Sequence, residues 1–449
     1  MVQLSLLSDA EWLSAARRRL EEEGVAGGAR ATLVGVRAAA GDGEFGGFVG
    51  DSLPVRVDVR LPHATAYREL AFFVKALPSD CEVHAQMAST AFHKEAVAYR
   101  NLFPAMRALL PGGRTWAPRA YVVRGDALLM EDLMVQGFVE RDRRQPFNFA
   151  HAAATLEALA DFHASAWLLE AELQRETGRP TPLLDRQPDA FAEGLFVEKP
   201  TAVIHRWFAG ALRGVQKAVQ YVPQLKNRPD IDSILERFPI IHAKMVELIK
   251  PSTKFKNVMN HGDLWSNNIL FRYGNGADAL PTDVRLVDFQ LVRYVPPAVD
   301  INQLLYLTTR PALRAARGGA LLRRYHRALA AALARGGACV DAFLPWDELL
   351  ASCDALRATG LITTPCYHHM SLVGPERFKH HFSPDNFEKF VLEERDELIE
   401  ECFRDDDYFR EKVGEEVLEL VEGVLLGKDA DFWTRTAQAP DAEAQNVRQ

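Results

Sequence analysis

Segments rich in β-branched residues gather in the first third of this 449-residue chain, and this asymmetry limits the folds open to it. RATLVGVRA and VRVDVRL carry the strand pattern, AFFVKALP is an apolar strand that ends at a proline, and YVVRG and ALLMEDL predict two more strands. After Asp132 the apolar residues recur at helical spacing, as in AAATLEALADFHASAW. The sequence therefore predicts an α+β chain with a small sheet-rich lobe and a larger, mainly helical lobe.

Within this plan, several segments have distinct expected structures. Ser89 or Thr90 can cap a helix that runs through FHKEAVAYRNLF. The stretch 170–200 has several prolines and glycines and is expected to be a long connection. ILFRY (269–273) and VRLVDF (284–289) predict a hairpin around Asn275-Gly276, the only strand signals of the second lobe. An opening helix begins with the capping-box pair Ser8 and Glu11. The expected divisions are an N-terminal helical extension 1–29, an N-lobe 30–129, a hinge 130–137, a C-lobe 138–432 and a polar tail 433–449.

Composition excludes several classes of protein. The formal net charge of −8 argues against a nucleic-acid or anionic-membrane surface, and the Arg-rich stretch 310–335 reads as a solvated helix face. No run of about 18 uninterrupted apolar residues is present, so we expect no membrane span. Five scattered cysteines suggest no disulfide framework, which favours a reducing, cytoplasmic setting.

The stretch NHGDLWSNNILF, residues 260–271, has the residues that a phosphoryl-transfer loop needs. Asp263 can orient an acceptor hydroxyl, and Asn268, five residues on, can offer its amide oxygen to Mg²⁺. The hairpin would bring Asp288 of LVDFQ beside Asn268, which gives two oxygen ligands on one metal. The D-x-x-x-x-N spacing alone arises often by chance, whereas its combination with HGD, the hairpin and a second "DF" is much harder to produce by accident.

The small lobe supplies a cation and its partner. Lys75 lies inside a predicted strand, where a buried ammonium needs a partner, and Glu95 lies about one helix further along. Taken alone, Lys75 would be interpreted as a solvent-facing lysine on an edge strand, and Glu95 as an exposed carboxylate on a helix. Together they match the strand-lysine and helix-glutamate pair with which kinases hold the nucleotide phosphates.

Two further segments are candidates for nucleotide contact. GDGEFGGFVGD, residues 41–51, contains Gly46 and Gly47, and its backbone amides can cover phosphates, although a flexible hairpin is an equal alternative. LLMEDL joins the lobes, and from its position we expect backbone hydrogen bonds from Glu131 and Leu133 to adenine.

With these motifs in order over roughly residues 40–310, the chain resembles the ecdysteroid-kinase-like (CHK kinase-like) family. That family lies within the aminoglycoside phosphotransferase and choline kinase group, which has the two-lobed protein-kinase-like fold. NHGDLWSNNILF, VDFQ followed by PPAVDI, FVKALP, FHKEAVAYRNLFP and LLMEDLMVQGF carry the resemblance. The resemblance implies that Asp263 is the catalytic base and that Asn268 and Asp288 bind Mg²⁺. It also implies that Lys75, paired with Glu95, binds ATP. Asp300 matches the family's later acidic residue and is interpreted as an anchor of the catalytic loop.

The acceptor is expected to be a small molecule rather than a protein. Gly262 stands where protein kinases have the arginine that reads a phosphorylated activation loop. The stretch from Asp288 to Pro296 leaves almost no room for an activation segment, and Gln290 replaces the glycine of D-F-G. A long platform for docking a peptide is therefore absent.

Acceptor-binding residues are sought at 361–387, where aromatic and histidine residues cluster outside any regular helix pattern. Cys366 and the histidines there fit no established zinc spacing. The acidic stretch 393–409 could face a cationic acceptor but reads as a solvated helix face, and His163 reads as a core histidine.

The sequence thus predicts a kinase that uses ATP and Mg²⁺ to phosphorylate a hydroxyl of a small lipophilic molecule, such as an ecdysteroid or a related alcohol or glucoside. A choline- or aminoglycoside-type kinase is one alternative, and a catalytically inactive hormone-binding protein on the same scaffold is another. No nucleic-acid or membrane partner is expected, and the oligomeric state is left open.

Overall fold

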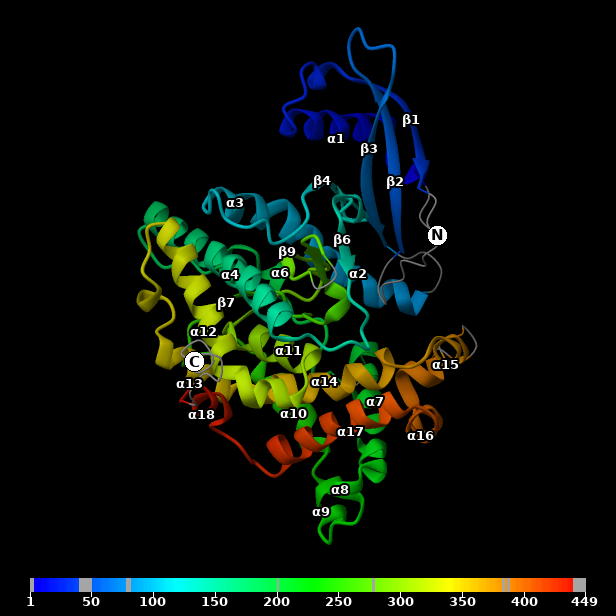
Figure 1. The fold of residues 1–449 in the computed structure, drawn as a ribbon, viewed down its shortest axis with the longest axis vertical. Coiled ribbons are helices and arrows are strands. Elements are labelled where there is room, and N and C mark those ends of the chain that lie inside the picture. The colour runs from blue at the N-terminus through cyan, green and yellow to red at the C-terminus, as the bar shows by residue number, and fades with distance from the viewer. Residues whose placement is uncertain are drawn as a thin grey trace.

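The structure, a computed structural model, describes residues 4–39, 51–77, 82–199, 202–276, 279–381, 383, 386 and 388–438. Figure 1 shows a twisted sheet at the top of the view and a larger mass of helices below it. The predicted α+β, two-lobed organisation is therefore confirmed. Within the described residues, no helix is both long and apolar enough to cross a lipid bilayer.

The small lobe is built on one antiparallel sheet with the strand order β1-β2-β3-β5-β4. Each strand lies where the sequence pattern predicts one. Helix α1 (Asp9–Glu22) packs its buried Trp12 and Leu20 on this sheet, and Ser8 and Glu11 form the predicted capping box. The strands are β1 (Thr32–Ala38), β2 (Asp51–Arg60), β3 (Arg68–Ala76), β4 (Ala120–Val123) and β5 (Ala127–Glu131).

The helix that follows β3 starts earlier than the sequence indicates. Helix α2 spans Glu82–Val97, so Ser89 and Thr90 lie inside it and the predicted cap is wrong. Residues 82–88 include neither glycine nor proline, and continuing a helix is favoured over starting a new one. A π-helical turn at Ala98–Leu102 then leads into α3 (Phe103–Ala108).

The large lobe begins with the long helix α4 (Phe149–Thr177), capped by Asn148, whose side chain accepts a hydrogen bond from the His151 amide at 3.1 Å. Because α4 continues to Thr177, the predicted connection at 170–200 is shorter than expected, and it contains two short helices. The next helices are α5 (Leu183–Arg186), α6 (Pro188–Phe191), α7 (Val203–Ala218), α8 (Pro223–Lys226), α9 (Ile231–Glu236) and α10 (Pro239–Leu248).

Five short strands carry the loops of the site. The hairpin of β8 (Ile269–Tyr273) and β9 (Pro281–Leu286) is the one that the sequence predicts. The sequence does not indicate three others, because three-residue strands have too few residues to show a period. They are β6 (Phe138–Glu140), which pairs with β8, and β7 (Val258–Asn260) and β10 (Arg293–Val295), which pair with each other.

Helices complete the chain. Residues 361–371, expected to lack a helix pattern, belong to helix α14, which contains Pro365 and is buried on nearly every side. A helix without an exposed face shows no amphipathic period, which is why the sequence pattern does not reveal it. The final helices are α11 (Ala298–Thr308), α12 (Pro311–Arg335), α13 (Trp346–Ala355), α14 (Arg357–Ser371), α15 (Pro375–His381), α16 (Asp396–Asp405), α17 (Asp407–Leu420) and α18 (Phe432–Gln438).

One boundary and the exposure of one arginine differ from the sequence-based expectation. Trp433, expected in the polar tail, is fully buried in α18, so the packed lobe extends at least through this helix. In the Arg-rich α12, Arg314 is buried rather than solvated, because it pairs with Glu419 of α17. An ion pair across two helices leaves no trace in local sequence.

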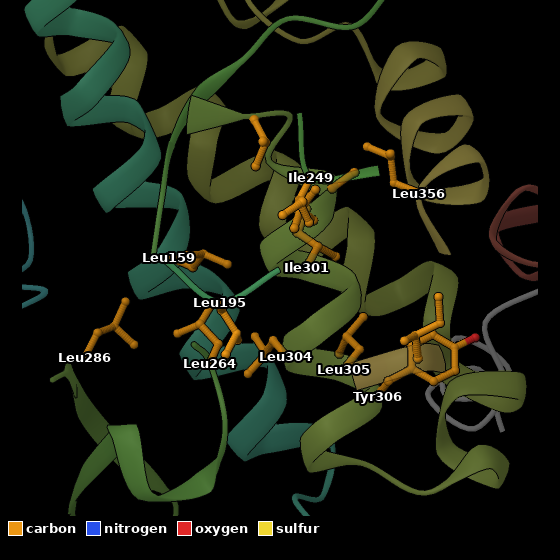
Figure 2. Close-up of a cluster of buried hydrophobic side chains, with 14 of the residues drawn as sticks. Leu159, Leu195, Ile249, Leu264, Leu286, Ile301, Leu304, Leu305, Tyr306 and Leu356 are labelled. Carbon is orange, nitrogen blue, oxygen red and sulfur yellow. The ribbon is translucent and has the colours of Figure 1, made fainter. Parts of the chain in front are cut away.

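The core of the large lobe lies around α11, all of whose residues are buried. Figure 2 shows Leu264 of the loop after β7 among the buried leucines and isoleucines that surround this helix. The loop after β7 is thus anchored in the core by an apolar side chain.

Candidate active site

The loop between β7 and β8 is held by one buried carboxylate. Asp300 of α11 accepts hydrogen bonds from the backbone amides of His261 at 2.6 Å and Gly262 at 2.9 Å. His163 Nε2 lies 3.2 Å from the same carboxylate, and both side chains are fully buried. These contacts agree with the interpretation of Asp300 as an anchor and of His163 as a core histidine.

Gly262 has a backbone conformation and surroundings that only glycine suits. Its φ is +81°, in the left-handed region. A Cβ atom there would lie 2.0 Å from the Leu291 carbonyl oxygen and 2.8 Å from Arg293 Nη1. No side chain fits at this position, so the arginine found there in protein kinases is excluded by space.

We therefore expect Gly262→Ala to destabilise the protein by at least about 2 kcal/mol and to displace the loop that carries Asp263. Gly178→Ala is the matched control, because Gly178 has a φ of +71° and a Cβ added there would meet nothing within 4 Å. Thermal unfolding of both variants, with ADP formation from ATP, checks this. Equal losses of stability in the two variants would contradict the steric account.

Asp263 follows directly, and one of its oxygens lacks a partner. Its Oδ2 accepts a 2.9 Å hydrogen bond from Asn268 Nδ2, whereas Oδ1 is buried and meets no donor at ordinary hydrogen-bond geometry among the described residues. The Tyr367 hydroxyl interacts with the same carboxyl group as a longer-range donor. Burial and the negative charge of Asp288 raise the pKa of Asp263 to about 7, although Tyr367, Arg293 and Asn268 oppose the shift. A carboxylate poised near neutral pH suits a general base.

Asp288 lies just beyond β9 in a left-handed conformation, with φ +67°. Such a conformation is uncommon for aspartate and is found where the surroundings enforce it. The Val287 amide donates to the Asn268 carbonyl oxygen at 3.0 Å, so the predicted hairpin brings Asn268 and Asp288 together. Asn268 uses its amide nitrogen on Asp263, and its side-chain oxygen has no hydrogen bond to the described residues.

Lys75 joins the two lobes at this point. Its Nζ lies 2.6 Å from Glu95 Oε2 and also contacts the Asp288 carboxylate. Glu95 Oε1 accepts from the Phe289 amide at 3.1 Å, so the helix glutamate is tied to the residue after Asp288. Burial alone would lower the pKa of Lys75, but the charges of Asp288 and Glu95 outweigh it and raise that pKa.

The balance of charge fits a metal-bound nucleotide. The Lys75 ammonium faces the carboxylates of Glu95 and Asp288, and Asp263 lies near enough to Asp288 for the negative charge there to raise its pKa. The Asp288 carboxylate and the Asn268 side-chain oxygen are of the kind that Mg²⁺ prefers, since this ion takes carboxylate and amide oxygens. We infer that Asn268 and Asp288 suit this ion.

The contacts of Glu131 and Leu133 with adenine stay a prediction, and the structure shows which backbone groups of the hinge are already bonded. The Glu131 amide is bonded to the Arg119 carbonyl oxygen at 3.0 Å, and the Leu133 carbonyl accepts from the amides of Gln136 and Phe138. The Leu133 amide has no partner within the described part of the chain. Gly46 and Gly47 lie outside the described residues.

Sequence reasoning missed the Asp132 side chain beside the hinge. Its carboxylate, 2% exposed, accepts hydrogen bonds from Arg56 at 2.9 Å and from the Met134 amide at 3.0 Å. It ties strand β2 to the hinge. The sequence signal that could have indicated this role is the pair of adjacent acidic residues in LLMEDL. The sequence pattern, however, marks Asp132 only as the point after which helical spacing begins.

An aromatic cluster near Asp263 was also missed. The Tyr367 ring of α14 is stacked on Trp265 with centroids 6.4 Å apart, and the ring centroid of Trp207 of α7 lies 6.2 Å from that of Tyr367. All three side chains are partly exposed. Of the region 361–387, Tyr367 is thus the residue that interacts with Asp263.

The histidines of that region have structural partners instead. His368 Nδ1 lies 2.7 Å from Glu416 Oε1, and His369 lies between the Pro365 carbonyl oxygen at 2.7 Å and Arg395 at 2.8 Å. Both rings are buried in the helical lobe. Expecting them in an acceptor pocket was wrong for these two residues.

Comparison with known proteins gives one family and several distant folds. The ecdysteroid kinase-like family matches residues 45–337. A search of the curated proteins finds no match.

Several solved structures are similar to this chain at low identity. Plasmodium vivax ethanolamine kinase is 11% identical with a TM-score of 0.37, over 92% of this chain and 88% of its own. A microcompartment-associated aminopropanol kinase is 11% identical with a TM-score of 0.41, over 88% and 93%. A spectinomycin phosphotransferase solved with ADP and spectinomycin is 10% identical with a TM-score of 0.31, over 80% and 93%. None of these likenesses is strong enough to assign an acceptor.

Proposed function

The chain belongs to the ecdysteroid kinase-like family, and from that premise we propose that it transfers the γ-phosphate of ATP, with Mg²⁺, to a hydroxyl of a small lipophilic molecule. The acceptor we propose is an ecdysteroid or a related alcohol or glucoside. The observation that carries the proposal is the contact of Lys75 with both Glu95 and Asp288, beside an Asp263 with an unpaired oxygen.

Each of these residues has one task in the proposal. Lys75, oriented by Glu95, holds the nucleotide phosphates. The Leu133 amide is available to donate a hydrogen bond to the adenine ring. Asn268 and Asp288 hold Mg²⁺, which when bound neutralises the charge that the phosphates develop. Asp263 Oδ1 accepts the proton of the acceptor hydroxyl while the hydroxyl oxygen attacks the γ-phosphorus of ATP and the bond from that phosphorus to ADP breaks. The products are ADP and a phosphate monoester.

Aromatic surface beside Asp263 supports a lipophilic acceptor. Trp207, Trp265 and Tyr367 come from three separate segments and present partly exposed rings there. Rings of this kind pack on flat apolar molecules. They can also hold a cation, so a choline- or aminoglycoside-type acceptor is the rival. The nearby Glu193 carboxylate does not favour that rival, because Arg293 already pairs with it at 2.7 Å.

A panel of acceptors tests the proposal. Mg²⁺-dependent ADP formation is measured with ecdysteroids, plant glucosides and amino alcohols, with Asp263→Ala as the blank. Turnover of a neutral, lipophilic member that is lost in the blank is the expected result. Preference for amino alcohols would replace the proposed acceptor by the cationic class. Hormone binding without ATP binding would favour the inactive binding protein.

A further inference from the structure

An ion pair between buried Arg293 and partly buried Glu193 lies against the peptide that precedes Asp263. Arg293 of β10 is 2% exposed at its side chain and meets the Glu193 carboxylate twice, with Nε to Oε2 at 2.7 Å and Nη2 to Oε1 at 3.1 Å. Its remaining nitrogen, Nη1, donates to the Gly262 carbonyl oxygen at 2.7 Å. One guanidinium therefore bridges a carboxylate and the catalytic loop.

Gly262 is held from both sides by this arrangement. Its amide donates to Asp300 and its carbonyl oxygen accepts from Arg293, so the residue before Asp263 has both polar backbone groups fixed. The β7–β10 pairing sets Arg293 opposite Asn260, which puts the guanidinium next to the loop. Space that a side chain at position 262 would need is taken up by the Arg293 guanidinium and the Leu291 carbonyl.

Glu193 is itself rigidly placed. It lies in the connection between α6 and α7, and its Oε1 accepts hydrogen bonds from the backbone amides of Leu195 at 2.7 Å and Phe196 at 3.0 Å. Leu195 is one of the core side chains around α11 (Figure 2). These two backbone hydrogen bonds fix the Glu193 carboxylate to the helical lobe.

A second cation faces the same carboxylate. Lys94 of α2, 1% exposed, has an Nζ with no hydrogen-bond partner among the described residues, and the charges of Glu193 and Arg293 act on it. Burial would raise the pKa of Glu193, but Arg293, through its charge and hydrogen bonds, and the charge of Lys94 lower it to about 2. Glu193 thus stays an anion between Arg293 of β10, which contacts the catalytic loop, and Lys94 of the N-lobe helix, whose own pKa burial lowers to about 8.

We propose that Glu193 is a built-in anion that holds Arg293 on the catalytic loop, in the role that a phosphate on an activation segment has in protein kinases. This proposal rests on the proposed kinase function. Protein kinases order their active site when an added phosphate meets an arginine beside the catalytic loop. Here the arginine comes from β10 and its anion is a side chain, so the loop is assembled without modification.

Glu193 and Arg293 are thereby positioning residues for Asp263. The ordinary alternative is an ion pair that contributes to stability alone, as buried pairs often do little else. The two readings differ in what happens to the loop when the carboxylate is removed and the helical lobe stays folded.

Glu193→Ala is the first test variant. It leaves two buried cations facing a small vacancy, and we expect kcat for ADP formation to fall roughly 10- to 100-fold because Asp263 is displaced, while KM for ATP changes less than about twofold. Sodium acetate or formate should restore much of the lost kcat by filling the vacancy with a carboxylate. Sodium chloride at the same ionic strength should not.

Glu419→Ala is the matched control. Arg314, with its side chain 1% exposed, pairs with Glu419 and donates to the Thr309 carbonyl oxygen at 2.7 Å, so the chemistry is the same on helices that carry no proposed site residue. We expect a similar loss of stability in this variant without a change in kcat or a response to acetate. Glu193→Gln serves if Glu193→Ala does not fold; it should lower kcat without rescue, since its amide fills the space.

Hydrogen exchange gives a readout that needs no turnover. Amide exchange over residues 261–263 should be faster in Glu193→Ala than in the wild type, should slow again with acetate, and should be unchanged in Glu419→Ala. Unaltered exchange at these amides, or a kcat loss equal in the two variants, would overturn the proposal. If the wild type transfers no phosphate at all, the kinase function fails, and the exchange experiment still decides whether Glu193 orders the loop.

Discussion

Replacing Asp263 with asparagine should lower phosphoryl transfer by about 10²- to 10⁴-fold and leave the fold intact. The amide keeps the size of the side chain and its contact with Asn268 but cannot accept the proton of the acceptor hydroxyl. ADP formation measured with the best acceptor, together with circular dichroism of both proteins, checks the expectation. A variant with more than half of the wild-type rate would contradict the assignment of Asp263.

The same substitution has an opposite effect on stability. The folded protein raises the pKa of Asp263 to about 7, from an ordinary value of 3.8, so the native state disfavours the carboxylate. The stability contributed by the protonated form is fully present below about pH 4 and is lost as the pH rises through 7. Asp263→Asn has no such group, so it should match the wild type near pH 4 and exceed it at pH 8.

The gain at pH 8 can reach about 4 kcal/mol at most, from a shift of about three pKa units. Thermal unfolding at the two pH values measures it. The wild-type kcat/KM, which reports the free enzyme, should fall as the pH drops below 7, because the base becomes protonated. An Asp263→Asn variant less stable than the wild type at pH 8 would show that Asp263 is not held as a strained carboxylate.

Lys75→Met should have the largest effect on stability. The methionine fills the space of the lysine stem but leaves Glu95 and Asp288 without their shared cation. Removing one partner of a buried ion pair typically costs about 3–5 kcal/mol. We therefore expect a large loss in the free energy of unfolding, measured by urea denaturation, together with loss of ATP binding.

A double variant separates charge from packing. Lys75→Met combined with Glu95→Gln removes one of the stranded carboxylates, so it should be more stable than Lys75→Met alone. Lys250→Met is the control on the surface, where the side chain is 51% exposed and its ion pairs contribute little. If Lys75→Met is as stable as Lys250→Met, the buried contacts of Lys75 do not hold the two lobes together.

The parts of the fold that the sequence predicts are those with a local signal. The hairpin that brings Asp288 to Asn268 follows from two apolar runs around a turn dipeptide, and the strand of Lys75 follows from an apolar run that ends at a proline. The pairing of Lys75 with Glu95 follows from a known arrangement of residue types, and the structure places their charged atoms 2.6 Å apart. Spacing along the chain carries this information.

The parts that escaped prediction depend on contacts between distant segments. Arg293 and Glu193 are 100 positions apart and neither lies in a recognisable motif. Tyr367 belongs to a helix buried on nearly all sides, where no hydrophobic period marks the face that meets Trp265. Such contacts arise from tertiary packing, which a single sequence does not display.

Binding of ATP, measured by calorimetric titration with and without Mg²⁺, is the sharpest test of the proposed nucleotide site, because it does not depend on knowing the acceptor. We expect saturable binding that Mg²⁺ tightens, that Asp263→Asn retains and that Asp288→Asn weakens only when Mg²⁺ is present. A wild-type protein that binds no ATP, or one whose affinity is the same with and without Mg²⁺, would show that these residues do not form a site for metal-bound ATP.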